Sequence, residues 1–336
     1  MLPQTRKVYN QYLAQIRQLN SIESTAEKFS VDPTIQQKLE ARIQDSSAFL
    51  KRVNILGVNE MEGEKVGINV NGPIASRTDT TGTTPRAPRD VKSLDKQKYR
   101  CEQTNYDTLI RYNTLDAWAK FPDFQQRLRN SIVTKMGLDR LMIGFNGTSA
   151  AATTNLVNNP LLEDVNIGWL QQIRDNASER HMFEVVDSSG EINVGDGGDY
   201  QNLDALVFDV VNSLIEPWYR DHPDIKAIIG RQLAVDYTIP QISEYDAPTE
   251  REALARLIAK SKIGGVPAVQ VPYMLPSAIL ITIPANLSIY YQNSARRRMI
   301  KDEPEWDRIA NYESSNDGYV VEDYGAAALI ENVQFV

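Results

Sequence analysis

The side chains that most often perform chemistry are sparse in this chain of 336 residues. It has two histidines, His181 and His222, and one cysteine, Cys101. These are too few for a thiolate zinc site, and no nucleophile signature surrounds Cys101, which lies in a strand-like segment. His222 stands between Asp221 and Asp224 in YRDHPD. Metal ligation is the minor alternative there, and a solvated turn is the favoured interpretation.

Two glycine-containing segments offer weak candidates for an anion site. VGDGGDY (194–200) has three glycines but no lysine, and its aspartates would repel phosphate, which favours a turn. Gly230 and Arg231 stand where an apolar strand passes into a helix, an arrangement that could hold an anion or a nucleotide. A single glycine at such a junction is common, so a nucleotide- or anion-binding α/β enzyme remains only a minor alternative.

Carboxylates gather in two runs near the C-terminus. Glu322 and Asp323 lie in VEDY, and four more lie in KDEPEWD (301–307). Neither run matches the spacing of a calcium-binding loop, so solvated edges or ion pairs between subunits are favoured. The sequence offers no base, nucleophile and metal-ligand set together. It therefore predicts a protein that is not an enzyme and that has no metal and no cofactor.

The composition is that of an ordinary globular chain with an acidic balance. Apolar residues make up 42% and the net charge is -8, which argues against a surface that coats nucleic acid. Residues 1–53 hold eight basic and five acidic residues, a net of +3 that leaves -11 for the rest. Two solvated helices explain this best, and a basic arm facing nucleic acid or an acidic partner is the alternative. A single cysteine fits a reducing compartment, and no apolar run is long enough for a membrane span.

Two amphipathic helices are expected at the N-terminus. Apolar residues recur at helical spacing from Tyr9 to Leu19, and again behind the start signal Asp32-Pro33. The polar segment NSIESTAEKFSV (20–31) separates the two helices. Because this pair precedes every segment that resembles a core, it must dock on the body of the chain or on a partner.

An extended hairpin is expected next. KVGINV (65–70) and KQKYRCEQTNY (96–106) alternate like strands and bracket a long polar tip. Such a ribbon has little apolar surface and needs another surface to lie on. The tip carries Arg77, Arg86 and Arg89, which could pair with acidic groups of a neighbouring copy. No aromatic residues are interleaved with them, which disfavours a platform for single-stranded nucleic acid.

A long helix and an α/β region follow the hairpin. The helix is expected from Pro122 to Phe145, roughly 36 Å, ended by the glycines of GFNGT (144–148). One apolar stripe of this helix contains Phe124, Leu128, Ile132 and Met136. Further helices and buried strands alternate in the middle, including a helix in APTEREALARLIAKSKIGG (247–265). The C-terminal region predicts antiparallel strands with a turn at Ser315–Gly318.

This order of parts resembles the major capsid protein of tailed bacteriophages with the Hong Kong 97-type fold. The resemblance is closer still to the capsid proteins of the P2-like contractile-tailed phages. It is carried by stretches spread along essentially the whole chain, in the family's order: GEKVGINVNGPIASRTDTTG, LIRYNTLDAWAKFPDFQQRLRN, IGWLQQIR, GGDYQNLDALVFDVVNSLIEPWY, IIGRQL, NLSIYYQ and NYESSNDGYVVEDYGAAALIE.

The resemblance implies an α+β fold whose parts have assembly roles. Residues 1–53 would be an N-terminal helical arm, trimmed by a prohead protease near 20–32, and 54–104 the E-loop hairpin that lies over the adjacent subunit. Residues 105–165 and 291–336 would form the peripheral domain, with a spine helix at about 122–145. Residues 166–290 would form the axial domain around the five-fold and six-fold axes.

The same resemblance implies a major capsid protein that self-assembles as hexamers and pentamers into an icosahedral shell. The shell would hold double-stranded DNA without sequence readout and would assemble on an internal scaffold, with a portal protein, in the cytoplasm of the bacterial host. Charge pairs at the tip arginines and apolar contacts along the spine helix would join subunits. No isopeptide pair can be assigned, so a non-covalent shell is expected. An encapsulin-like compartment of the same fold is the alternative.

Overall fold

The computed structural model describes the chain apart from residues 67–68, 71–74, 76, 80–91, 94–95, 119–120, 122 and 244–261. Its helices are α1 (Pro3–Asn20), α2 (Pro33–Asp45), α3 (Tyr112–Trp118), α4 (Phe124–Asn146), α5 (Trp169–Asn176), α6 (Leu203–Leu214), α7 (Pro217–Arg220) and α8 (Arg231–Ser243). Single turns of 3-10 helix cover Leu50–Arg52, Ser178–Arg180, Pro284–Asn286, Pro304–Trp306 and Tyr324–Ala326.

The strands of the first half are β1 (Phe29–Ser30), β2 (Asn54–Val58), β3 (Glu62–Val66), β4 (Asn69–Val70), β5 (Lys92–Ser93), β6 (Lys96–Arg100), β7 (Glu102–Asn105), β8 (Thr108–Arg111), β9 (His181–Met182) and β10 (Ile192–Val194). Those of the second half are β11 (Lys226–Ile229), β12 (Lys262–Ile263), β13 (Val266–Gln270), β14 (Ile279–Thr282), β15 (Leu287–Gln292), β16 (Arg297–Glu303), β17 (Arg308–Val321), β18 (Ala327–Ile330) and β19 (Val333–Phe335).

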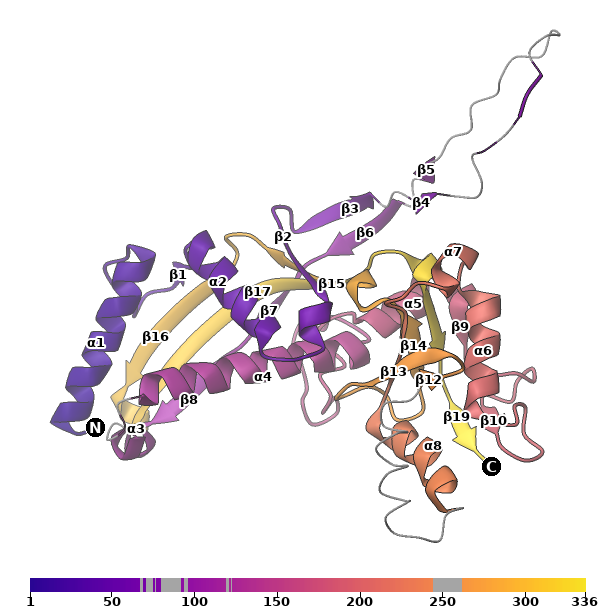
Figure 1. Cartoon of the computed structure of the whole chain (residues 1–336). Coiled ribbons are helices and arrows are strands. Elements are labelled where there is room, and N and C mark those ends of the chain that lie inside the picture. Colours follow the sequence, from indigo (N-terminus) through magenta and orange to yellow (C-terminus); the bar gives the residue numbers. More distant parts are fainter. Residues whose placement is uncertain are drawn as a thin grey trace.

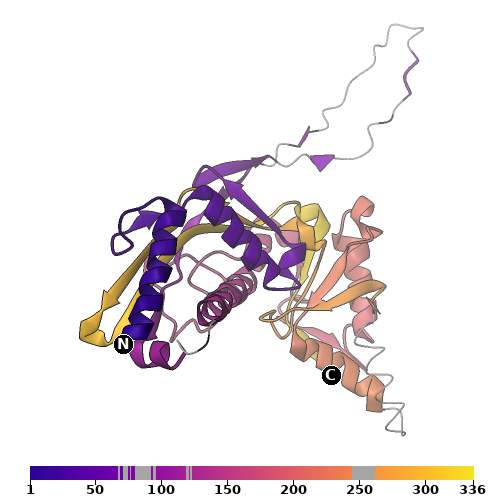
Figure 2. The same ribbon diagram turned by 60° about the vertical axis from the view of Figure 1, so that its left-hand side comes forward.

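The body has two lobes, each built on one sheet. One lobe holds the seven-stranded sheet together with α1, α2 and the long helix α4, and the other holds the six-stranded sheet together with α6 and α8 (Figures 1 and 2). The two chain ends lie at opposite ends of the body (Figure 1). The hairpin of β3 and β6 leaves the body on one side, where both views show it projecting away from the two lobes.

The two N-terminal helices are present and both dock on the body. Asp32 caps α2 by accepting a hydrogen bond from the Thr34 amide, and Pro33 occupies the first helical position. α1 packs its apolar face, including Tyr9 and Ile16, on Ile300 and Ile309 of the seven-stranded sheet. The segment between the helices is also attached, because β1 pairs with β16.

β17 is the central strand of the seven-stranded sheet and corrects one prediction. It runs without interruption for 14 residues and pairs with β16, β15, β7 and β8. The turn expected at Ser315–Gly318 is therefore wrong. These residues favour turns in general, but here Ser315 and Asp317 are buried and hydrogen-bonded to each other, and Gly318 gives room for the Arg100 carbonyl.

The strand expected over 96–106 is present but divides at Cys101. Its first part, β6, pairs with β3 in the hairpin, and its second part, β7, pairs with β17 in the body. β2, at the other end of the predicted hairpin segment, pairs in parallel with β15. The chain thus enters and leaves the hairpin from within the same sheet, which fixes where the hairpin is attached.

The six-stranded sheet has the order β12-β13-β11-β14-β18-β9 and is covered on both faces. Alternate residues of its central strands enter different cores, as the two-residue period of a strand requires. Ile228, Leu280 and Leu329 join the core that also contains residues of α4 and α5, whereas Ile229 and Ile281 join the core under α6. Burial on both faces explains why β14 is a continuous apolar run.

The long helix α4 connects the lobes, and its C-terminal half is buried in a core shared by both sheets. Gly144 was expected to help end this helix, but the helix continues to Asn146. The glycine instead admits the Trp169 ring, because a β-carbon at position 144 would lie 2.4 Å from a ring carbon. Trp169 is fully buried and meets Phe145 and Tyr319 edge to face. The helix predicted at 247–265 falls largely outside the described residues.

Candidate assembly sites

The base of the hairpin is clamped to the body by two of its side chains, Lys65 and Tyr99. Lys65 of β3 is 8% exposed, donates a hydrogen bond to the Val321 carbonyl, and lies over the Tyr324 ring with Nζ 5.5 Å from its centre. Tyr99 of β6 meets Tyr290 of β15 edge to face, with ring centres 5.1 Å apart. These contacts hold the hairpin at a defined angle although its strands have little apolar surface.

Cys101 lies at the point where the strand changes partners. Its amide donates to the Met61 carbonyl at 2.8 Å, and its thiol is completely buried beside Tyr290 and Val320. Burial raises the pKa of this thiol to about 12, and the nearby Asp317 carboxylate adds to the shift. Cys101 is therefore a structural residue of the hairpin base and is not an activated nucleophile.

A buried network of charges holds α2 against α4 and the seven-stranded sheet. Glu40 of α2 is 3% exposed and binds two arginines from distant parts of the chain. Its Oε2 accepts from Arg140 Nη1 at 2.5 Å, and its Oε1 accepts from Arg296 Nη1 at 2.8 Å. Both arginines are fully buried, so each depends on its partners to compensate lost hydration.

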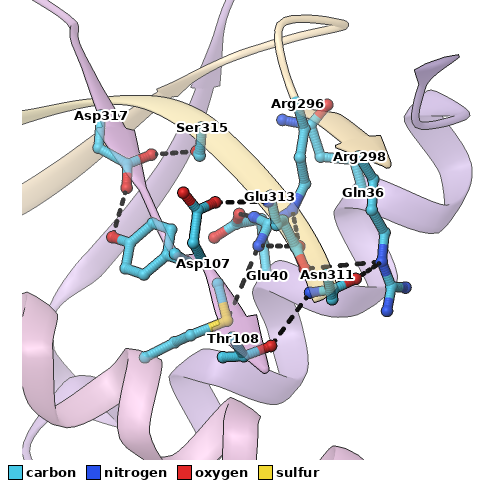
Figure 3. A network of polar contacts seen from close by, with 12 residues as sticks. Gln36, Glu40, Asp107, Thr108, Arg296, Arg298, Asn311, Glu313, Ser315 and Asp317 are labelled. Carbon is cyan, nitrogen blue, oxygen red and sulfur yellow. Dashed lines mark hydrogen bonds and ion pairs between the residues drawn. The ribbon is translucent and has the colours of Figure 1, made fainter. Parts of the chain in front are cut away.

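Each arginine also has a second acidic partner from β17. Asp317 Oδ2 accepts from Arg140 Nη2 at 3.1 Å, and Glu313 Oε1 accepts from Arg296 Nε at 2.7 Å. Figure 3 shows the part of this network around Glu40, Arg296 and Glu313. We call Glu40, Arg140, Arg296, Glu313 and Asp317 the buried charge network.

The pKa values of Arg140, Arg296 and Glu313 are each shifted in the direction that favours the charged form. Burial alone would lower the pKa of Arg140, but the charges of Asp317 and Glu40 outweigh it and raise that pKa well above its usual range. For the acid Glu313 burial acts in the opposite direction and would raise the pKa. The charges of Arg296 and Arg298 outweigh it and hold that pKa below the ordinary value. α2 is consequently attached to the body by charge pairs that are shielded from water.

The three tip arginines are only partly described. Arg77 is exposed, which leaves it available to another molecule. Arg86 and Arg89 lie outside the described residues. Their role in contacts between subunits remains a prediction.

The four apolar residues expected along the spine helix fall on α4. Ile132 is partly buried and Met136 is 3% exposed, and both pack against the residues of α2 in the same chain. The side chains of Phe124 and Leu128 lie outside the described ones. A role of this stripe in contacts between subunits remains a prediction.

The residues that were weaker candidates for chemistry make contacts within the chain that explain them without a ligand. His222 Nδ1 accepts from the Asp224 amide at 3.1 Å, as a turn residue does. The space beside Gly230 is filled by the carbonyls of Met274 and Leu275, whose oxygens would repel an anion. His181 Nε2 lies 2.7 Å from Glu331 in an intrachain pair. Among the described residues, no group of three or more histidine, cysteine or acidic side chains could hold a metal ion.

The carboxylate runs at 301–307 and 322–323 make contacts within the chain. Asp302 pairs with Arg6 of α1, and Glu303 pairs with Arg308 at 2.7 Å. Glu322 and Asp323 accept hydrogen bonds from the hydroxyl groups of two tyrosines. These acids therefore stabilise the subunit. No helix in the described part of the chain is long and apolar enough to span a membrane.

Comparison with known proteins shows the family. Residues 8–333 match the family described as phage major capsid protein, P2 family. The chain belongs to the P2 family of phage major capsid proteins. This capsid protein is 47% identical to the capsid proteins of Escherichia phage P2, over 99% of this chain and 96% of that one. It is 42% identical to the major capsid protein of Serratia phage KSP20, over 98% and 97% of the two chains.

Solved structures agree with this assignment. A chain of the satellite phage P4 procapsid, a structure that includes the size determination (Sid) protein, is 46% identical, with a TM-score of 0.83 over 100% of this chain and 99% of that one. The capsid of an empty GTA particle has a TM-score of 0.51 at 15% identity, over 86% and 90% of the chains, and shows the fold alone. The capsid protein has the Hong Kong 97-type fold, as its sequence predicted.

The buried charge network is the feature that sequence reasoning missed. Glu40 lies at the edge of the apolar stripe that contains Leu39 and Ile43, and Arg140 adjoins the fully buried Leu141. A charge that borders an apolar stripe is the signal that could have indicated a buried ion pair. The sequence does not say which partners meet, because they are far apart along the chain.

Proposed function

We propose that this capsid protein assembles as hexamers and pentamers into a closed icosahedral shell around the double-stranded DNA of a tailed phage. The observation that carries the proposal is the hairpin of β3 and β6, clamped at its base by Lys65 and Tyr99 and projecting beyond the body. A rigidly based projection with little apolar surface of its own is suited to lie over an adjacent copy. The exposed Arg77 adds a positive charge that the acidic remainder of a neighbouring chain can pair with.

The partners and the location follow from this role. An internal scaffold and its prohead protease would direct assembly in the host cytoplasm, a portal protein would occupy one vertex, and the DNA would be held without sequence readout. Protease trimming would fall between α1 and α2, where the segment 21–28 is largely exposed. A structural rather than catalytic role is supported by the complete burial of Cys101 and the turn contact of His222.

Electron microscopy of the chain co-expressed with its scaffold tests the proposal. The wild type should give closed particles of uniform size. A variant in which residues 71–90 are replaced by Asn-Gly should stay folded, because the clamp at the hairpin base is intact, but should fail to close shells. Closed particles from this variant, or only monomers and small rings from the wild type, would refute the proposal. Mature particles should also give monomers in boiled denaturing gels.

A further inference from the structure

A cavity of about 370 Å³ lies between α1, α2, α4 and the seven-stranded sheet. Ile16 and Leu19 of α1, Ile35 and Leu39 of α2 and Ile132 of α4 contribute to its apolar walls. This volume lies in the range of sites that bind ligands. Leu19 is 51% exposed although it lines the cavity, so the cavity opens to solvent along the end of α1.

Three basic side chains line the same cavity beside the apolar walls. Lys38 and Arg42 of α2 and Arg129 of α4 are all exposed, and none forms an ion pair with another described residue. Arg298, which also lines the cavity, differs because it is bonded to Asn311 and to the Tyr12 hydroxyl. An apolar cleft with three exposed cations at its edge fits a partner that is apolar and acidic.

The spacing on α2 indicates the shape of that partner. Ile35 and Leu39 are four residues apart, and so are Lys38 and Arg42. Residues four apart lie above one another on a helix, so α2 presents an apolar stripe and a basic stripe side by side. Each stripe is about 6 Å long at 1.5 Å per residue, and together the two stripes cover about 10 Å of α2. A small anion would use only one cation, whereas a helix lying along α2 would use both stripes.

We propose that this cleft docks an acidic amphipathic helix of another protein. Its apolar stripe would enter the cavity, and its Glu or Asp residues would face Lys38, Arg42 and Arg129. The inference deepens the proposed function, on which it rests for the source of the helix, namely the internal scaffold. Because α1 forms one wall, a cut between α1 and α2 followed by loss of α1 would also remove the docking site.

Fluorescence anisotropy of two labelled peptides with the soluble full-length subunit tests this. Both are 18-residue amphipathic helices with one leucine stripe; one is flanked by Glu and the other by Lys. The Glu peptide should bind the wild type at least tenfold more tightly than the Lys peptide. Lys38→Glu with Arg42→Glu should reverse that preference. Lys7→Glu, a single charge reversal at an exposed position of α1 outside the cavity, should change affinity less than twofold.

A second variant separates docking in the cavity from general charge attraction. Leu39→Trp fills the cavity without changing charge, and it should abolish binding of the Glu peptide while circular dichroism shows an unchanged fold. Equal affinity for the two peptides, no binding of either, or wild-type binding by Leu39→Trp would overturn the inference. These outcomes are independent of shell formation, which microscopy scores separately. A failure of docking is thereby distinguished from a failure of the proposed function.

Discussion

Replacing Glu40 with Gln should detach α2 from the body. Glu40 accepts three hydrogen bonds from two guanidinium groups, at 2.5, 3.2 and 2.8 Å, and is 3% exposed. Removing its charge leaves Arg140 and Arg296 with one carboxylate each in a site that water does not reach. Because each arginine keeps one carboxylate, the cost should lie below that of an uncompensated buried charge, at about 2–3 kcal/mol. That is a large part of the roughly 5–15 kcal/mol by which a domain is stable.

Urea unfolding of the soluble subunit, with hydrogen exchange of peptides covering 33–45, measures the effect. Exchange over α2 should accelerate most, because α2 supplies only Glu40 to the network. The matched control is Asp45→Asn, which removes a charge from the same helix but from an exposed pair with Lys51, worth at most about 1 kcal/mol. A Glu40→Gln subunit within 1 kcal/mol of the wild type, with unchanged exchange over α2, would refute the reasoning.

Three further substitutions or treatments follow from the packing and the charges. Gly144→Ala should destabilise by about 1–3 kcal/mol, seen as a lower Tm, because its β-carbon would overlap the Trp169 ring; an unchanged Tm would contradict this packing. Cys101 should resist a thiol reagent at pH 8 until urea is added, since burial and nearby carboxylates raise its pKa to about 12; rapid native reaction would mean an open hairpin base. Burial opposes ionisation of Glu331, but Arg174 and His181 lower its pKa from 4.5 to about 2. A lowered pKa stabilises above the unfolded value, so Glu331→Gln should cost about 3 kcal/mol at pH 7 and progressively less as pH falls from 4.5 toward 2. A cost that stays constant over that range would count against the pairing.

Local patterns were sufficient to predict the main elements. The start signal Asp32-Pro33, the long apolar periodicity ending near Phe145 and the alternation at 96–106 each correspond to an observed element. These elements are specified by patterns among residues close in sequence, and such patterns can be recognised in a single sequence. The turn predicted at Ser315–Gly318 was wrong for the opposite reason. Those residue types favour turns when exposed, and here tertiary contacts bury two of them in a strand.

The arrangement around Glu40 could not be predicted in the same way. An acidic residue on an amphipathic helix is exposed by default, and its partners at 140 and 296 belong to other elements. The cavity beside α1 is likewise formed where three helices and a sheet meet, so no single element predicts it. Long-range pairing and the volume left between elements are properties of the tertiary structure.

The double attachment of Glu40 also constrains how the chain can change during evolution. Loss of the acid leaves two arginines short of a partner, and loss of either arginine leaves Glu40 with one cation where it had two. Each of these single substitutions leaves at least one buried charge with fewer partners than it has now. Positions 40, 140 and 296 are therefore expected to co-vary. Relatives that depart from this pattern should replace the three residues as a set.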